Sequence, residues 1–141
     1  MNPHTVPPST VADDEVLARF ILHKRYIRND GTLKPDSFIP HPYTDLSVTR
    51  HVGLEESSIW AIGEGVAIQQ SKTLYGRGDV LASDFRSLKL RVDADPIPGN
   101  AHHANVTNWP QDKPAQKMYA QEIAAVASFV SRPTAQNWPA N

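Results

Sequence analysis

Hydrophobic side chains along this chain recur with two spacings: every second residue in some stretches, and every third or fourth in others. Asp45–Val52 and Leu88–Val92 alternate apolar with polar residues, which predicts strands with one solvated face. Leu17–Ile27 is rich in aromatic and β-branched residues and predicts another strand. Shorter strands are expected at Val80–Ala82 and His103–Thr107. These stretches together supply a sheet.

The helical spacing appears in two stretches. Leu54–Gln70 has acidic residues in its first turn and one apolar stripe, which favours a helix. Gly63 and Gly65 inside it each cost about 1 kcal/mol relative to alanine. We therefore expect the sheet to pack closely against both glycines. A second helix is expected from Asp112, as the N-cap, to the stop at residues 131–133.

The positions of glycine and proline predict the turns and loops that connect these strands and helices. Asn29–Gly31 predicts a turn, residues 34–42 predict an extended proline-fixed link, and Leu74–Asp79 predicts a loop or short edge segment. Strands and helices that do not alternate strictly predict an α+β fold, a small mainly antiparallel sheet with two amphipathic helices packed on one face. We expect one domain over residues 11–131, a flexible N-terminal tail over 1–10 and a C-terminal tail over 132–141.

Composition narrows the classes of function. The 141 residues contain 12 prolines and no cysteine, and the net charge is −1. Disulfides and thiolate metal sites are excluded, and no strongly basic field attracts nucleic acid or membrane. Neither glycine-rich phosphate loop is present, so no cofactor is expected. Without a secretory signal or a long apolar run, we expect a cytoplasmic protein.

The alternating stretch at Asp45–Val52 carries the most reactive side chains. Arg50 falls on the inward face, where it needs a carboxylate partner. The candidates for that partner are Asp36, Asp79 and Asp84. The outward row is either a solvated strand face or part of a site; it consists of Asp45, Ser47, Thr49 and His51. Side chains along one strand stand parallel, so this row does not form a catalytic triad by itself.

Residues from other segments extend the candidate site. His51 and His103 could act as acid and base near neutral pH. Arg77 in the glycine loop could hold an anionic substrate while Tyr75 stacks on it. The candidate ligand-binding residues are Tyr75, Arg77, Arg50 and Trp109. A metal site could draw on His41, His51 and His102 or His103, with Asp93 or Asp95. No metal is predicted, because the adjacent histidines on a strand point to opposite faces.

Four runs give the chain a resemblance. They are KPDSFIPHP at residues 34–42, DLSVTRH at 45–51, LYGRGD at 74–79 and WPQDKPAQK at 109–117. The chain resembles a group of short bacterial proteins that share these runs and have no known activity. The resemblance implies a bacterial cytoplasmic origin and assigns a role to no residue.

Three functional hypotheses follow. The first is a non-catalytic module that binds a protein partner, with Trp109 and Tyr43 as anchors. The second is an enzyme for a phosphorylated or nucleotide-like substrate, with His51, His103 and Arg77 in its site. The third is a weak nucleic-acid binder, which requires two basic groups to be neighbours. These groups consist of Lys24, Arg25 and Arg28, and of Lys89 and Arg91.

Overall fold

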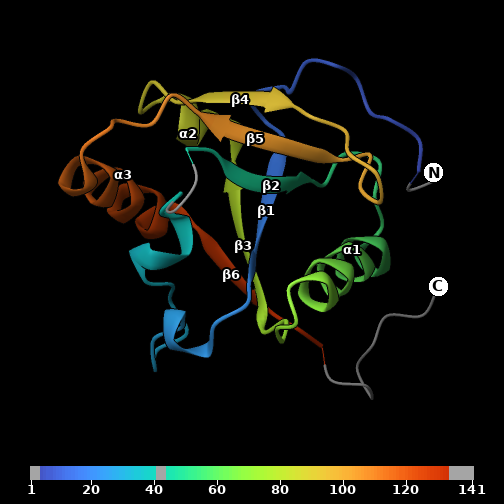
Figure 1. Ribbon diagram of the computed structural model, residues 1–141, viewed down its shortest axis with the longest axis horizontal. Coiled ribbons are helices and arrows are strands. Elements are labelled where there is room, and N and C mark those ends of the chain that lie inside the picture. The colour runs from blue at the N-terminus through green and yellow to red at the C-terminus, as the bar shows by residue number, and fades with distance from the viewer. Residues whose placement is uncertain (1–3, 41–43, 134–141) are drawn as a thin grey trace.

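The computed structural model describes residues 4–40 and 44–133, which form a six-stranded antiparallel sheet with helices packed against it (Figure 1). The strand order is β4-β5-β2-β1-β3-β6. The strands are β1 Val16–Ile21, β2 Leu46–Arg50, β3 Gly76–Leu81, β4 Arg91–Ala94, β5 His103–Thr107 and β6 Ser128–Ser131. The helices are α1 Glu56–Gln69, α2 Ala82–Arg86 and α3 Lys113–Val126, with 3₁₀ segments η1 Lys24–Tyr26 and η2 Pro35–Phe38. The predicted α+β class is confirmed.

The two main helices share hydrophobic clusters with different side chains of β1. Leu17 and Ile21 are buried in the main core together with Ile123 of α3. Phe20 points the other way, towards α1, where a Cβ added to Gly63 would lie 2.7 Å from its ring. Alternate residues of a strand face opposite sides. The helices therefore lie on opposite sides of the sheet, with α3 at the left and α1 at the right of Figure 1, and not together on the one face expected from the sequence.

The stretch expected to be a loop or edge segment is an interior strand. β3 pairs with β1 over six residue pairs and with β6 over four. Its glycines make this possible because neighbours come close to the backbone. A Cβ at Gly76 would lie 2.6 Å from the Phe129 ring, and one at Gly78 would lie 2.7 Å from Leu33. Glycine in a strand marks such close approach as well as turns, and the sequence prediction took it as a turn.

Other boundaries also differ from expectation. β1 ends at Ile21, six residues early, and η1 follows it. The link expected to be extended contains η2, which has Pro35 in its first turn. The last helix ends at Val126, and the next residues form β6 as a partner for β3. The short helix α2 was not predicted, and the strand expected at Leu88–Val92 is shifted to β4.

Three elements agree with the sequence prediction. β5 covers His103–Thr107 as expected, and α1 lies inside the predicted helical stretch. α3 begins after Asp112, whose carboxylate accepts a hydrogen bond from the Ala115 N–H at 3.1 Å. The confirmed N-cap satisfies one of the free amides at the helix start.

Candidate functional site

Arg50 belongs to the scaffold. Its side chain is only 1% exposed, so the predicted inward placement is confirmed. It lies 2.7 and 2.8 Å from the two carboxylate oxygens of Glu15 and donates to the Pro8 carbonyl at 2.7 Å. Burial raises the pKa of the Glu15 carboxyl, but hydrogen bonds and the charge of Arg50 outweigh it and lower the pKa overall. The partner is therefore Glu15 and none of the three acids expected from the sequence, which were Asp36, Asp79 and Asp84.

His51 and Arg77 form a second ion-pair network. His51 Nε2 lies 3.0 Å from Asp79 Oδ1, and Arg77 Nε donates to the same oxygen at 3.0 Å. Arg77 Nη1 lies 2.7 Å from a carboxylate oxygen of Glu56, and its guanidinium lies 4.7 Å from the Trp60 ring centroid. Burial would lower the pKa of Arg77, but Glu56 and Asp79 outweigh it and raise the pKa. The network ties α1 to the sheet.

The two predicted aromatic contacts also have internal partners. The Trp109 indole N–H donates to the Val106 carbonyl at 2.9 Å, and its ring centroid lies 6.4 Å from that of Tyr119. The half-buried Tyr75 follows α1 and pairs through its backbone N–H with Ile21. Two side chains considered from the sequence, His41 and Tyr43, lie outside the described residues.

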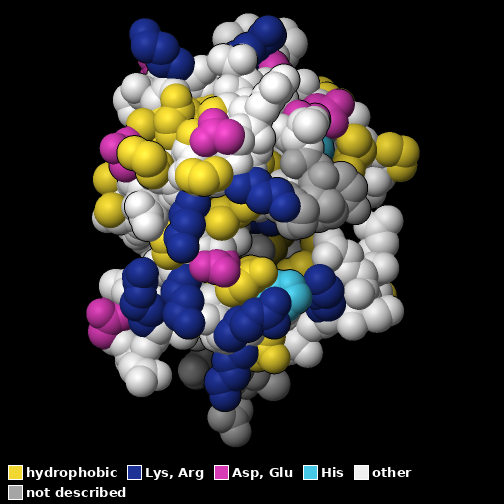
Figure 2. All heavy atoms as spheres, turned by 60° about the vertical axis from the view of Figure 1, so that its left-hand side comes forward, with side chains coloured by type: hydrophobic (Ala, Val, Ile, Leu, Met, Phe, Trp, Pro, Cys, Tyr) yellow, Lys and Arg dark blue, Asp and Glu magenta, His cyan; other side chains and the backbone are white. Residues whose placement is uncertain are grey.

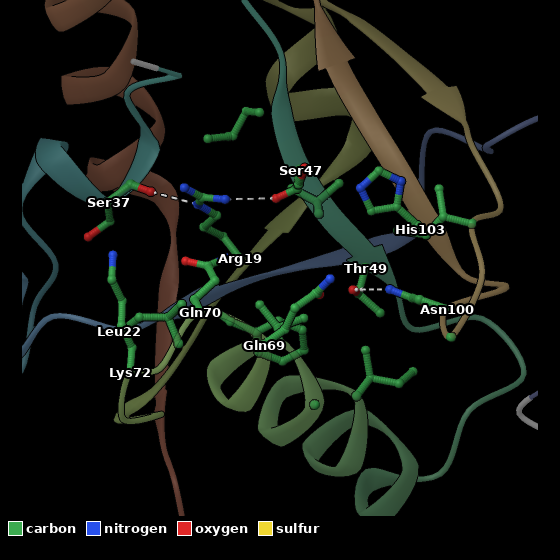
Figure 3. A pocket seen from close by; sticks show the side chains of 18 of the residues that line it. Arg19, Leu22, Ser37, Ser47, Thr49, Gln69, Gln70, Lys72, Asn100 and His103 are labelled. Carbon is green, nitrogen blue, oxygen red and sulfur yellow. Dashed lines mark hydrogen bonds between the residues drawn. The ribbon is translucent and has the colours of Figure 1, made fainter. Parts of the chain in front are cut away.

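A pocket of about 980 Å³ lies between α1 and the β1–β2 part of the sheet (Figure 3). β1 and β2 pair only at Leu17 with Arg50 and Ala18 with Thr49. Beyond these pairs the two strands separate, and the pocket reaches into the gap between them. Residues of the sheet that line it are Arg19, Phe20, Leu46, Ser47, Val48, Thr49 and His103.

The wall formed by α1 explains its second glycine. Gly65 lines the pocket, and a Cβ added there meets no atom within 4 Å. The expected close packing is right for Gly63 and wrong for Gly65, which faces open space. Other residues on this wall recur at helical spacing and are mostly small or apolar: Ser58, Ala61, Ile62, Val66 and Gln69.

Arg19 is the main charged group of the pocket. Its Nε donates to the Ser37 carbonyl at 3.0 Å, and Nη1 donates to the Ser47 carbonyl at 3.1 Å (Figure 3). The bond to Ser47 crosses the gap between β1 and β2, and the bond to Ser37 links β1 to η2. Burial lowers the pKa of Arg19 to about 10, so the guanidinium is charged at neutral pH. Two exposed acids, Asp36 and Asp45, also line the pocket, but neither forms an ion pair with Arg19 among the described residues.

Further polar groups surround this guanidinium. The Ser37 side chain is 2% exposed, and its hydroxyl has no hydrogen-bond partner among the described residues. Lys72 Nζ lies 3.2 Å from His23 Nε2. Burial lowers the pKa of His23, and the positive charges of Lys72 and of nearby arginines lower it further. The pocket lining therefore holds two cations, Arg19 and Lys72, and two acids, Asp36 and Asp45, neither of which is an ion-pair partner of Arg19 among the described residues.

His103 of β5 lines the same pocket opposite Thr49, which lies two residues after Ser47 on β2. Its Nδ1 lies 2.9 Å from the Asp95 carbonyl oxygen and 3.2 Å from the Asp95 carboxylate. Opposite His103, the Thr49 hydroxyl accepts a hydrogen bond from Asn100 at 3.0 Å. Of the predicted catalytic and ligand-binding residues, His103 lines the pocket, whereas His51, Tyr75, Arg77, Arg50 and Trp109 do not.

The two predicted basic groups are far apart in the sheet. β5 and β2 separate β4, which contains Arg91, from β1, which leads to Lys24 and Arg25. Figure 2 shows Lys and Arg side chains gathered on the lower half of one face, the level at which η1 lies in Figure 1. The arrangement required for the nucleic-acid hypothesis, with both groups as neighbours, is absent from the described residues.

Comparison of the chain with protein-family models, curated proteins and solved structures finds no match. The resemblance to short bacterial proteins stays a prediction. No helix among the described residues has the length and apolar character needed to cross a membrane. The pocket is therefore interpreted from its own chemistry.

Proposed function

We propose that this protein binds a small molecule that carries an anionic group on an apolar body. The observation that carries the proposal concerns the four arginines of restricted exposure. Arg50, Arg77 and Arg86 each form an ion pair with a carboxylate, whereas Arg19 forms none among the described residues. A cation removed from water needs compensation, and a bound anion would supply it.

The surroundings of Arg19 support the same ligand class. Its Nη2 forms no hydrogen bond with a described residue, so a guanidinium donor is available to a ligand. Carboxylates and phosphates both match a guanidinium donor. The apolar part of the ligand would lie against side chains from β2 and α1, including Val48, Ile62 and Val66.

Calorimetric titration of the purified protein tests the proposal. The probes are phenyl phosphate, benzoate and hexanoate, with inorganic phosphate and neutral benzamide as comparisons. A charge-assisted hydrogen bond is worth about 1.5–3 kcal/mol, so Arg19→Gln should weaken binding roughly 10- to 150-fold. Arg91→Gln removes the same charge from an exposed position and should leave the affinity unchanged.

A second variant tests the proposal even if Arg19→Gln does not fold. Gly65→Leu adds a side chain to the open wall and favours the helix, so it should abolish binding while the protein stays folded. The proposal is wrong if benzamide binds as tightly as benzoate, if Arg19→Gln binds normally, or if no anion binds. A cytoplasmic location and a protein partner stay predictions, to be checked by cell fractionation and by pull-down from the native cell.

A further inference from the structure

His103 is held so that one ring nitrogen is fixed and the other is free. A carbonyl oxygen only accepts hydrogen bonds, so the contact with the Asp95 carbonyl at 2.9 Å places the proton on Nδ1. Nε2 then carries the lone pair, and it has no hydrogen-bond partner among the described residues. The Asp95 carboxylate is itself oriented by Asn105, whose amide donates to it at 3.0 Å. The ring is only 11% exposed, and it lines the pocket.

Thr49 presents a hydroxyl directly opposite this ring. The Arg50 N–H donates to the His102 carbonyl, which makes these two residues a hydrogen-bonded pair. The next pair, Thr49 with His103, is therefore of the non-hydrogen-bonded type, in which side chains lie closest. Since the Thr49 oxygen accepts from Asn100, its own proton remains available for donation.

We infer that the pocket hydrolyses carboxylic esters whose acyl chain ends in an anion, with His103 as the general base. The inference rests on the proposed anion binding at Arg19. Arg19 donates to the Ser47 carbonyl, two residues before Thr49 on β2, so the anion anchor and the Thr49 hydroxyl border the same pocket. A base, a hydroxyl donor and an anion anchor are the groups that such a hydrolysis requires.

The reaction uses water as its only co-reactant. Nε2 of His103 takes a proton from water, and the water oxygen forms a bond to the ester carbonyl carbon. The Thr49 hydroxyl donates to the oxygen that becomes negative. The bond from this carbon to the alkoxy oxygen then breaks, and the leaving oxygen receives the proton from Nε2. The products are a carboxylic acid and an alcohol, without oxidation or reduction.

Hydrolysis of the mono-4-nitrophenyl ester of adipate, compared with the neutral 4-nitrophenyl ester of hexanoate, tests this assignment. The wild-type protein should prefer the anionic ester at least tenfold in kcat/KM. His103→Gln should lose at least 100-fold in kcat, whereas Arg19→Gln should chiefly raise KM. His51→Gln is the matched control, because that imidazole pairs with Asp79 outside the pocket, and its rate should be unchanged.

Nitrogen chemical shifts of the His103 ring give a readout that needs no substrate. At pH values where the ring is neutral, they should show the proton on Nδ1. A proton on Nε2, no ester turnover, or full turnover by folded His103→Gln overturns the hydrolytic role. Titration with adipate separates the two proposals: Arg19-dependent binding without turnover refutes hydrolysis alone, and failure of both binding and turnover refutes both.

Discussion

The two glycines of α1 should respond in opposite ways to the same substitution. Gly65→Ala introduces a methyl group into open space, because no atom lies within 4 Å of its Cβ position. Gly63→Ala places that methyl group 2.7 and 2.8 Å from two ring carbons of Phe20 and 3.0 Å from Leu74. Ordinary carbon contacts lie near 3.5–4.0 Å, so the ring must move by close to an ångström.

The magnitudes follow from helix propensity and packing. Both variants gain about 1 kcal/mol from replacing a helical glycine. Overpacking a filled interior costs about 1–3 kcal/mol, which applies to Gly63→Ala alone. Unfolding entropy for 141 residues is about 0.3 kcal/mol/K, so 1 kcal/mol shifts Tm by roughly 3 °C. Gly65→Ala should raise Tm by about 3 °C, and Gly63→Ala should lower it by about 3 °C.

Thermal unfolding followed by circular dichroism measures both values, and urea unfolding at 25 °C checks them independently. Equal stabilisation by the two substitutions would refute the reasoning, since it would mean that Phe20 does not pack against Gly63. Destabilisation by Gly65→Ala would contradict the open pocket wall on which the ligand proposal depends.

Three other outcomes are expected. Glu15→Ala leaves the buried Arg50 without its carboxylate and should lower the free energy of unfolding by about 3 kcal/mol. Asp13→Ala removes an exposed partner of Arg86 and should lower it by less than about 1 kcal/mol. Urea unfolding of both variants measures the difference. The folded state lowers the pKa of Glu15, so the ionised carboxylate stabilises the fold fully above its unfolded-state pKa of 4.5. This stabilisation is lost as pH falls through the folded-state pKa. Glu15→Gln should therefore flatten the acid limb of a plot of Tm against pH. A bound anion favours the protonated form of His23, whose pKa is lowered in the free protein. Phenyl phosphate should therefore raise the pKa of His23 in an NMR titration and bind more tightly as pH falls. An unchanged pKa would place the anion elsewhere.

The alternating pattern of β2 was sufficient to place Arg50 inside, because the faces of a strand follow directly from residue parity. It was not sufficient to find Glu15, which lies 35 residues earlier and meets Arg50 only through sheet pairing. β3 was missed for a related reason. Its glycines are required by Phe129 and Leu33, contacts that local propensity does not contain.

The pocket was missed because it arises where β1 and β2 stop pairing, which is a property of two strands together. One signal was nevertheless present in the sequence. Arg19 stands between Leu17 and Ile21 at alternate positions of a strand, so a charge interrupts an otherwise apolar face. A charged residue between two apolar positions of a predicted strand is therefore the sequence signal that marks Arg19 as a candidate.

Arg50 and Arg19 show how a scaffold arginine differs from a ligand-binding one. Both project from strands of the same sheet with restricted exposure, and both donate to backbone carbonyls. Arg50 has the Glu15 carboxylate as well, so its charge is compensated within the fold. Arg19 retains its charge without a carboxylate, an arrangement that costs stability in the free protein. Proteins tolerate such costs where function requires them, so the missing counter-ion is the strongest reason to place the ligand's anionic group at Arg19.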